Sequence, residues 1–323
     1  MNFRTTYLGL DLKSPFVVGA SPFCDDVDMA YRLEEAGAAA LVMRSLFEEQ
    51  IGAPRRAATP VVVDDGIHVP EYAEYQLSPN EYLRQIERLK KRVTIPVIAS
   101  LNGYHPGGWI EFSRKIEAAG ADAIELNFYH VVTDSALAAD QVEMEMLGLT
   151  CTVSGSVRIP VAVKLSPFHA SVAQLAVALE LSGAAGVVVF NRFYQPDIDP
   201  EDLRVYPTLR LSDTSDLLLR LRWLAILSPL LRGSLAVTGG VHTTAGVVKS
   251  ILAGANAVQL VSVLLRDGPH VISTLGAGLD HWMRDHGYQE IEEFRGALNL
   301  SRCPDPAAFE RANYIRMLQS WRA

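Results

Sequence analysis

Short apolar runs, often rich in β-branched residues, alternate along the chain with longer stretches rich in Ala, Leu, Glu and Arg. The short runs have the length and composition of buried strands, and the longer stretches are typical of helices. The pattern predicts eight strands, at residues 16–20, 40–44, 96–101, 123–128, 160–165, 186–191, 234–238 and 257–262. It predicts helices at about 26–37, 79–92, 108–120, 136–156, 171–182, 215–231, 243–254 and 268–286.

Several predicted helices end in a small-residue turn that leads into the next strand, as at Glu35-Ala36-Gly37-Ala38 and Leu252-Ala253-Gly254-Ala255. Glycine suits the left-handed position that closes a helix. Eight strand–helix units favour an α/β fold of the closed TIM (β/α)8 barrel type over an open doubly wound sheet. No GxGxxG motif follows the first strand, which also argues against the open sheet. We therefore predict one barrel domain over residues 1–323.

Four segments fall outside this rhythm. Residues 5–14 are expected to form a short hairpin before the first strand, and residues 287–323 a helical cap. Long proline-containing connections at 46–78 and 193–214 each follow a strand end, on the face where barrel active sites lie. Loops of this length in a compact domain usually serve as lids or binding loops. We therefore expect long loops around a site at the C-terminal face.

Charge and composition narrow the function. With 29 Lys and Arg against 37 Asp and Glu, the formal net charge is −8, which disfavours nucleic acid and anionic membranes as partners. No apolar run reaches the about 20 residues of a membrane-spanning helix, and the first residues lack a signal-peptide pattern. We expect a soluble cytoplasmic protein. The scattered Cys24, Cys151 and Cys303 predict no disulfide framework, metal site or iron–sulfur centre.

The strongest sign of a ligand is Thr238-Gly239-Gly240 at the end of the seventh predicted strand. Two glycines let the backbone approach a phosphate closely, and the next helix would point its N-terminus at the anion. Ser262 ends the eighth strand, and the loops after these two strands commonly hold phosphate in barrels. The alternative is a tight turn without a ligand. We favour a phosphate site because both loops carry suitable residues.

Polar side chains also end other predicted strands. Lys164 ends an apolar run, and a buried ammonium needs an anionic partner, such as a reduced flavin. A Schiff-base substrate, or a side chain that reaches solvent, are the alternatives. Arg44, Asn102, Asn127 and Asn191 lie at comparable strand ends. Three converging amides would suit a planar heterocycle such as an isoalloxazine ring.

These residues resemble the dihydroorotate dehydrogenase family, specifically its soluble class 1 branch. The resemblance covers about 5–298. The stretches that carry it are Ser14-Pro15-Phe16, Ala20-Ser21, Glu125-Leu126-Asn127, Val163-Lys164-Leu165, Asn191, Ile198-Asp199-Pro200-Glu201, Thr238-Gly239-Gly240, Ala253-Gly254-Ala255, Asp267-Gly268-Pro269, His286-Gly287-Tyr288 and Phe294-Arg295-Gly296. The resemblance implies a homodimeric FMN enzyme of pyrimidine biosynthesis that oxidises a CH–CH bond of dihydroorotate or a related ring. FAD is disfavoured because no separate adenine-binding fold is visible.

Matched position by position, the resemblance implies a role for most of the polar strand ends. Arg44 stands where the family usually has a flavin-contacting lysine, and Asn191 falls on a substrate-contacting position. We place Asn102 with Asn191 at the substrate. The residues assigned to FMN are Ala20, Ser21, Arg44, Asn127, Lys164, Gly239, Gly240 and Ser262.

The departures from the family concern the substrate. Where class 1 relatives carry their catalytic Cys, the chain reads Tyr129-His130-Val131. An orotate-binding Asn-x-Met-Gly-Leu-type segment is replaced by Pro70-Glu71-Tyr72-Ala73-Glu74-Tyr75, and a small-residue segment by Leu211-Ser212-Asp213-Thr214-Ser215-Asp216. A neutral imidazole is a chemically suitable base, so we predict His130 as the catalytic base. The alternatives are Tyr129 as the base, or a loop in which neither residue is catalytic. Lys164 is the second residue predicted as catalytic. We expect dihydroorotate itself to react slowly or not at all.

Two other functions remain open at this point. One is a flavin-free barrel lyase that uses Lys164 as a Schiff-base nucleophile. The other is a subunit that binds FMN without turnover of its own. The leading hypothesis is an FMN oxidoreductase with a small-molecule substrate and an electron acceptor that a partner protein could carry.

Overall fold

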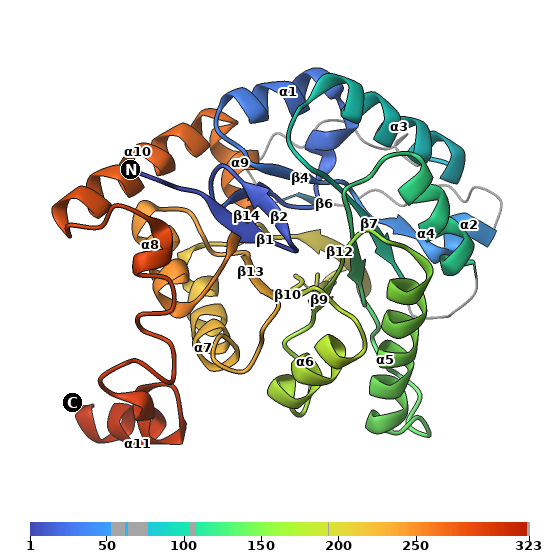
Figure 1. Ribbon diagram of the computed structural model, residues 1–323. Helices are drawn as coiled ribbons and strands as arrows, with labels where there is room; N and C mark the ends of the chain where they lie inside the picture. Colours follow the sequence, from blue (N-terminus) through green and yellow to red (C-terminus); the bar gives the residue numbers. More distant parts are fainter. Residues whose placement is uncertain (53–61, 64–76, 104–107, 193, 322–323) are drawn as a thin grey trace.

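The computed structural model describes residues 1–52, 62–63, 77–103, 108–192 and 194–321. All eight predicted strands form, and every pairing between them is parallel (Figure 1). Their order is β4, β3, β14, β13, β10, β9, β8 and β7, and β4 also pairs with β7. The bounds are β3 (Phe16–Val18), β4 (Ala40–Val42), β7 (Val97–Asn102), β8 (Ala123–Asn127), β9 (Val161–Leu165), β10 (Gly186–Val189), β13 (Ser234–Thr238) and β14 (Ala257–Leu260). The closed ring confirms the TIM barrel and excludes the open sheet.

The eight predicted helices surround the strands (Figure 1). They are α1 (Val27–Glu35), α3 (Pro79–Arg92), α4 (Trp109–Ala118), α5 (Ala139–Ser156), α6 (Val172–Leu181), α7 (Leu217–Leu227), α8 (Thr244–Ala253) and α10 (His270–Asp285). A capping box begins α3, because the Ser78 hydroxyl accepts from Glu81 N at 3.3 Å while the Glu81 carboxylate accepts from Ser78 N at 2.8 Å. The sequence pattern missed the short α9 (Ser262–Asp267) after the last strand.

Side chains alternate along each barrel strand between a helix-facing core and the barrel interior. In β8, Ile124 and Leu126 belong to the helix-facing core, whereas Ala123 packs in the interior with Ala162 and Ala236. This alternation decides where polar residues go. Residues two positions beyond an interior alanine, on the same strand face, project into the upper part of the barrel.

A hairpin closes the N-terminal end of the barrel. β1 (Thr5–Tyr7) and β2 (Leu10–Leu12) pair antiparallel within the segment expected to form it. Tyr7 and Leu8 are buried in the interior cluster, and Leu8 N donates to the Ser234 hydroxyl at 2.8 Å. Since Ser234 begins β13, the hairpin covers the end opposite the long loops.

Several connections differ from the prediction in detail. The expected strands at 40–44, 186–191 and 257–262 stop at Val42, Val189 and Leu260, so Arg44, Asn191 and Ser262 lie just beyond strand ends. The long connections contain further elements, namely β5 (Leu46–Phe47), α2 (Glu48–Gly52), β6 (Val62–Val63), β11 (Pro196–Asp199) and β12 (Arg204–Leu209). β11 and β12 form an antiparallel pair, and β12 pairs with β6. These contacts join the two long connections.

The chain after α10 contains short 3-10 turns and α11 (Arg311–Ser320), which has no buried residues and lies apart from the strands (Figure 1). No helix in the described part of the chain combines the length and the apolar character needed to span a bilayer.

Candidate functional site

Four of the predicted site residues meet at the carboxyl ends of neighbouring strands. Asn102 on β7 lies opposite Asn127 on β8, which lies opposite Lys164 on β9. All three are buried. Asn191, just beyond β10, donates from Nδ2 to Asn127 Oδ1 at 2.7 Å. The structure therefore places an ammonium and three amides at one level of the barrel mouth.

Lys164 has protein partners that the sequence reasoning missed. Its Nζ lies 3.2 Å from Glu125 Oε1 and 3.4 Å from Gln259 Oε1. Gln259 Nε2 donates to Glu125 Oε2 at 2.6 Å. All three side chains are buried, and the described residues thus supply a carboxylate that compensates the ammonium inside the barrel. The predicted need for an anionic partner is met by the chain itself.

Tyr7 of the N-terminal hairpin lies beneath this group. Burial raises the pKa of Tyr7 well above its usual value, and the charge of Glu125 raises it further. The Tyr7 hydroxyl has no hydrogen-bond partner of good geometry among the described residues, although Gln259 lies near enough to oppose the rise slightly. The buried hairpin residues therefore close the interior cluster from below.

The glycine turn after β13 meets two other segments through Ser212. Gly240 N donates to the Ser212 hydroxyl at 3.2 Å, and Ser212 N donates to the Ser262 hydroxyl at 3.1 Å. His242 Nε2 lies 3.2 Å from the same Ser212 hydroxyl. Burial, followed by the charge of Arg266, lowers the pKa of His242. The structure thus brings Gly240 and Ser262 to one buried point, which suits the phosphate site predicted for them.

Backbone geometry at the turn requires glycine. Gly239 and Gly240 have φ of +85° and +84°. A Cβ on Gly240 would lie 2.4 Å from Leu217 N at the start of α7. Arg220 of α7 is buried below the turn and donates to the carbonyl oxygens of Thr238 and Asp216, the latter at 2.7 Å. Nothing in the sequence pattern predicted that this cation supports the turn.

The remaining predicted cofactor residues follow β3 and β4. Ser21 is buried, and its hydroxyl has no hydrogen-bond partner among the described residues. Ala20, beside it, is partly buried. Arg44 forms an ion pair with Asp25, with Nη2 and Oδ2 3.5 Å apart. A buried hydroxyl without a partner at the barrel mouth is a group that a bound ligand would satisfy.

The predicted base and its alternative lie beyond β8. His130 is half-buried. The Tyr129 hydroxyl accepts from Tyr194 N at 3.1 Å, which ties this segment to the loop after β10. The stretch at 70–75, which replaces the orotate-binding segment of the family, lies outside the described residues. Within the described ranges, no group of three or more His, Cys, Asp or Glu side chains could hold a metal ion.

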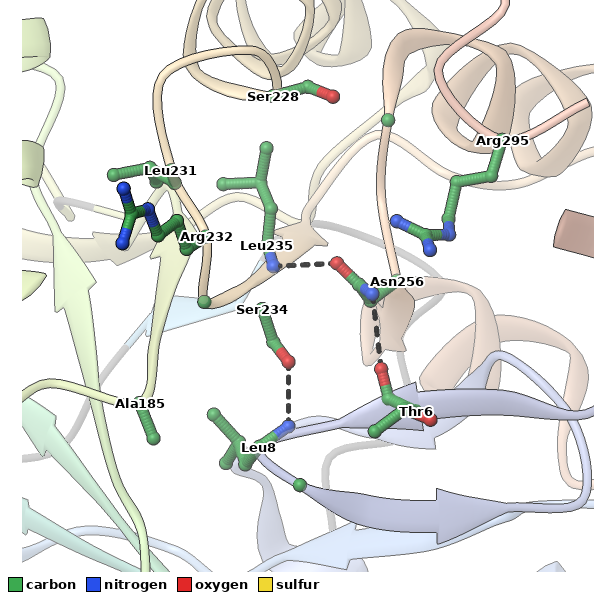
Figure 2. A pocket seen from close by; sticks show the side chains of 13 residues that line it. Thr6, Leu8, Ala185, Ser228, Leu231, Arg232, Ser234, Leu235, Asn256 and Arg295 are labelled. Carbon is green, nitrogen blue, oxygen red and sulfur yellow. Dashed lines mark hydrogen bonds between the residues drawn. The ribbon is translucent and has the colours of Figure 1, made fainter.

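A cavity of about 520 Å³ lies at the opposite, N-terminal end of the barrel (Figure 2). Several of its polar groups bond to one another. Asn256 donates to Thr6 O at 3.1 Å and accepts from Leu235 N at 2.9 Å. These bonds fasten the hairpin to the barrel. We therefore place the functional site at the carboxyl ends of the strands, where buried charge and amides meet.

Comparison with known proteins finds relatives that are named as dihydropyrimidine or dihydroorotate dehydrogenases. No model of a known protein family matches the chain. The NAD-dependent dihydropyrimidine dehydrogenase subunit PreA of Escherichia coli is 25% identical over 320 residues, which cover 93% of this chain and 77% of that protein. A dihydroorotate dehydrogenase B (NAD(+)) catalytic subunit of Methanosarcina acetivorans is 28% identical, over 89% of this chain and 93% of the relative. A putative dihydroorotate dehydrogenase A (fumarate) of Aeropyrum pernix is 27% identical, over 82% and 87%.

Proposed function

We propose that this chain, which is of the dihydroorotate-dehydrogenase-like family, is an FMN-dependent oxidoreductase that oxidises a CH–CH bond of a dihydropyrimidine-type ring. One observation carries the proposal. A glycine turn suited to phosphate and a cluster of one ammonium and three amides lie at the same end of a single barrel. This is the arrangement that a phosphorylated, planar, redox-active ring requires.

The residues present suit FMN. Gly239, Gly240 and Ser262 would hold the phosphate, with Ser212 joining the two loops. The Ser21 hydroxyl, buried without a partner among the described residues, would gain one from the cofactor. Lys164 and Asn127 would hydrogen-bond the ring system from the ends of β9 and β8, with Ala20 and Arg44 beside it. Bound FMN would supply the electron chemistry by accepting a hydride from the substrate.

The substrate would lie against Asn102 and Asn191, and His130 would remove the proton. Asn191 is already oriented by its bond to Asn127, which couples the substrate side of the site to the cofactor side. Half-burial of His130 leaves the imidazole reachable from the mouth. Because relatives named for dihydropyrimidines and for dihydroorotate are both similar, the ring class is better supported than either substrate.

The contacts of Lys164 argue against the Schiff-base lyase. A nucleophilic amine must lose its charge to expose a lone pair. In this structure the Lys164 amine is instead in an ion pair with Glu125, 3.2 Å away. The same contact favours a role in which Lys164 acts through ion pairs and attracts negative charge rather than as a nucleophile.

The names of the relatives also bear on the partners of this chain. Two of the similar proteins are named as subunits. We propose a cytoplasmic homodimer that passes electrons to an acceptor, for which a partner protein is one source.

Reconstitution tests cofactor binding. The chain purified from cells, or unfolded and refolded with FMN, should be yellow and retain one FMN per chain through gel filtration. Ser262→Val, which removes a proposed phosphate ligand, should retain less FMN, whereas Ser273→Ala on α10 should retain as much as the parent. A parent protein that stays colourless with FMN would contradict the proposal.

A further inference from the structure

Glu125 is a fully buried carboxylate inside the barrel, in a layer above interior alanines. An isolated carboxylate there would be strongly unfavourable. Its two oxygens have different partners, because Oε1 accepts from Lys164 and Oε2 accepts from Gln259. Residues of two other strands, β9 and β14, therefore fix this carboxylate of β8.

The position of Lys164 depends on this arrangement. An ammonium has three donors. Among the described residues, Glu125 and Gln259 take two of them from below, at 3.2 Å and 3.4 Å. The third donor is left for a group at the barrel mouth. Gln259 in turn is oriented by its short bond to Glu125, so its oxygen faces the ammonium.

We propose that Glu125, fixed by Gln259, is a positioning residue that holds the Lys164 side chain at the barrel mouth through their ion pair and moderates its attraction for electrons on bound FMN. The inference deepens the proposed function and rests on it. A carboxylate 3.2 Å from an ammonium cancels part of its field, so the pair acts on the cofactor more weakly than a lone cation.

The surroundings of Tyr7 show that the Glu125 carboxylate bonds upward to Lys164 and Gln259 rather than downward to the hairpin. The Tyr7 hydroxyl lies below Glu125 but makes no hydrogen bond of good geometry among the described residues. Burial and, after it, the nearby charge of Glu125 raise the pKa of Tyr7. The carboxylate is therefore available to Lys164 and Gln259 and is not shared with the hairpin below.

The first experiment uses the FMN-free protein and measures urea unfolding of three variants. Glu125→Gln and Lys164→Met each leave one buried charge without its partner, so each should shift the folding equilibrium at least about a hundredfold toward the unfolded state. The double variant removes both charges and should be closer to the parent than either single variant. A Glu125→Gln chain that folds only with Lys164→Met would support the proposal equally. Additive losses would overturn it.

The second experiment measures the midpoint potential of bound FMN by dye equilibration. Glu125→Gln should make the potential more positive, and Lys164→Met more negative. Glu125→Asp keeps the charge and should lie between Glu125→Gln and the parent. The control is Glu34→Gln, because Glu34 is a buried carboxylate that accepts from Thr94 N at 3.1 Å, outside the barrel interior.

A Glu125→Gln potential that matches the Glu34→Gln potential, or that moves in the direction of Lys164→Met, would overturn the inference. The two experiments separate its failure from that of the proposed function. If the parent takes up no FMN, the proposed function fails, and the unfolding experiment still decides whether Glu125 and Lys164 are coupled.

Discussion

At the scale of single residues, two buried tyrosines differ in how their hydroxyls are satisfied. Tyr82 OH donates to Ser100 O at 3.1 Å and accepts from Ser100 N at 2.8 Å. The Tyr7 hydroxyl has no such partner in the described part of the chain. A buried polar group without a hydrogen bond lowers stability, whereas removing a hydrogen-bonded one leaves its former partners without a hydrogen bond.

This difference predicts opposite results for the same substitution. Tyr82→Phe should lower the free energy of unfolding by about 1–3 kcal/mol, because Ser100 N loses its acceptor. Tyr7→Phe should be neutral or slightly stabilising. Urea unfolding of both variants makes the comparison, and equal losses would show that Tyr7 is hydrogen-bonded after all.

His130 carries the most specific chemical prediction. If its imidazole takes the substrate proton, His130→Ala should slow flavin reduction by about a hundredfold or more, the usual range for general base catalysis. FMN content should be unchanged, because His130 is not assigned to the cofactor. Tyr129→Phe is the matched variant and should keep most of the rate. Full speed in His130→Ala with a slow Tyr129→Phe would transfer the role to Tyr129.

Single-residue patterns predicted which polar side chains lie together at the strand ends better than they predicted what those side chains contact. Lys164 and the strand-end asparagines were recognisable because polar residues interrupt or end apolar runs. The partners Glu125 and Gln259 lie 39 and 95 residues from Lys164 in the chain. Such contacts depend on strand order and register, which an alternating pattern does not fix. Arg220 was missed because it reads as one polar position of an ordinary helix.

At the scale of elements, the turn after β13 depends on α7 as much as on its own glycines. Leu217 begins α7 and packs directly against Gly240. The hydroxyl of Ser212, in the loop before α7, accepts a hydrogen bond from Gly240 N. The expected departure from the family at 211–216 therefore coincides with a segment that still contributes a hydroxyl to the turn.

Alanine substitutions at two glycines would separate the cost of steric crowding from the cost of backbone strain. Gly9 and Gly240 both have positive φ, of +77° and +84°. A Cβ at Gly9 would meet nothing within 4 Å, whereas at Gly240 it would meet Leu217 N at 2.4 Å. Gly9→Ala should cost about 1–2 kcal/mol from backbone strain. Gly240→Ala should cost roughly 1–3 kcal/mol more and should reduce FMN retention.

Thermal unfolding and FMN content of the two variants provide the measurement. Equal destabilisation would mean that the turn has room to relax away from α7.

The positions of helices and strands were predictable because each element carries its own apolar period. The pairing of β6, β11 and β12 was not, because those short strands have no such period and meet only through long connections.

At the scale of the whole molecule, the closed ring of strands brings distant residues to one mouth. Asn102 on β7 and Gln259 on β14 are far apart in sequence, yet both belong to the same barrel. The count of eight strand–helix units was enough to predict this closure. The depth and shape of the substrate pocket were not predictable, since they depend on the long loops after the strands.

The most direct test of the account is anaerobic reduction of the FMN-loaded protein, followed by loss of the visible flavin absorbance. Dihydrouracil, dihydrothymine and dihydroorotate would be added separately, with dithionite as the positive control. The account predicts that at least one dihydropyrimidine bleaches the flavin and that dihydroorotate does so slowly or not at all. A protein that dithionite bleaches but none of the three rings does would contradict the proposed oxidoreductase.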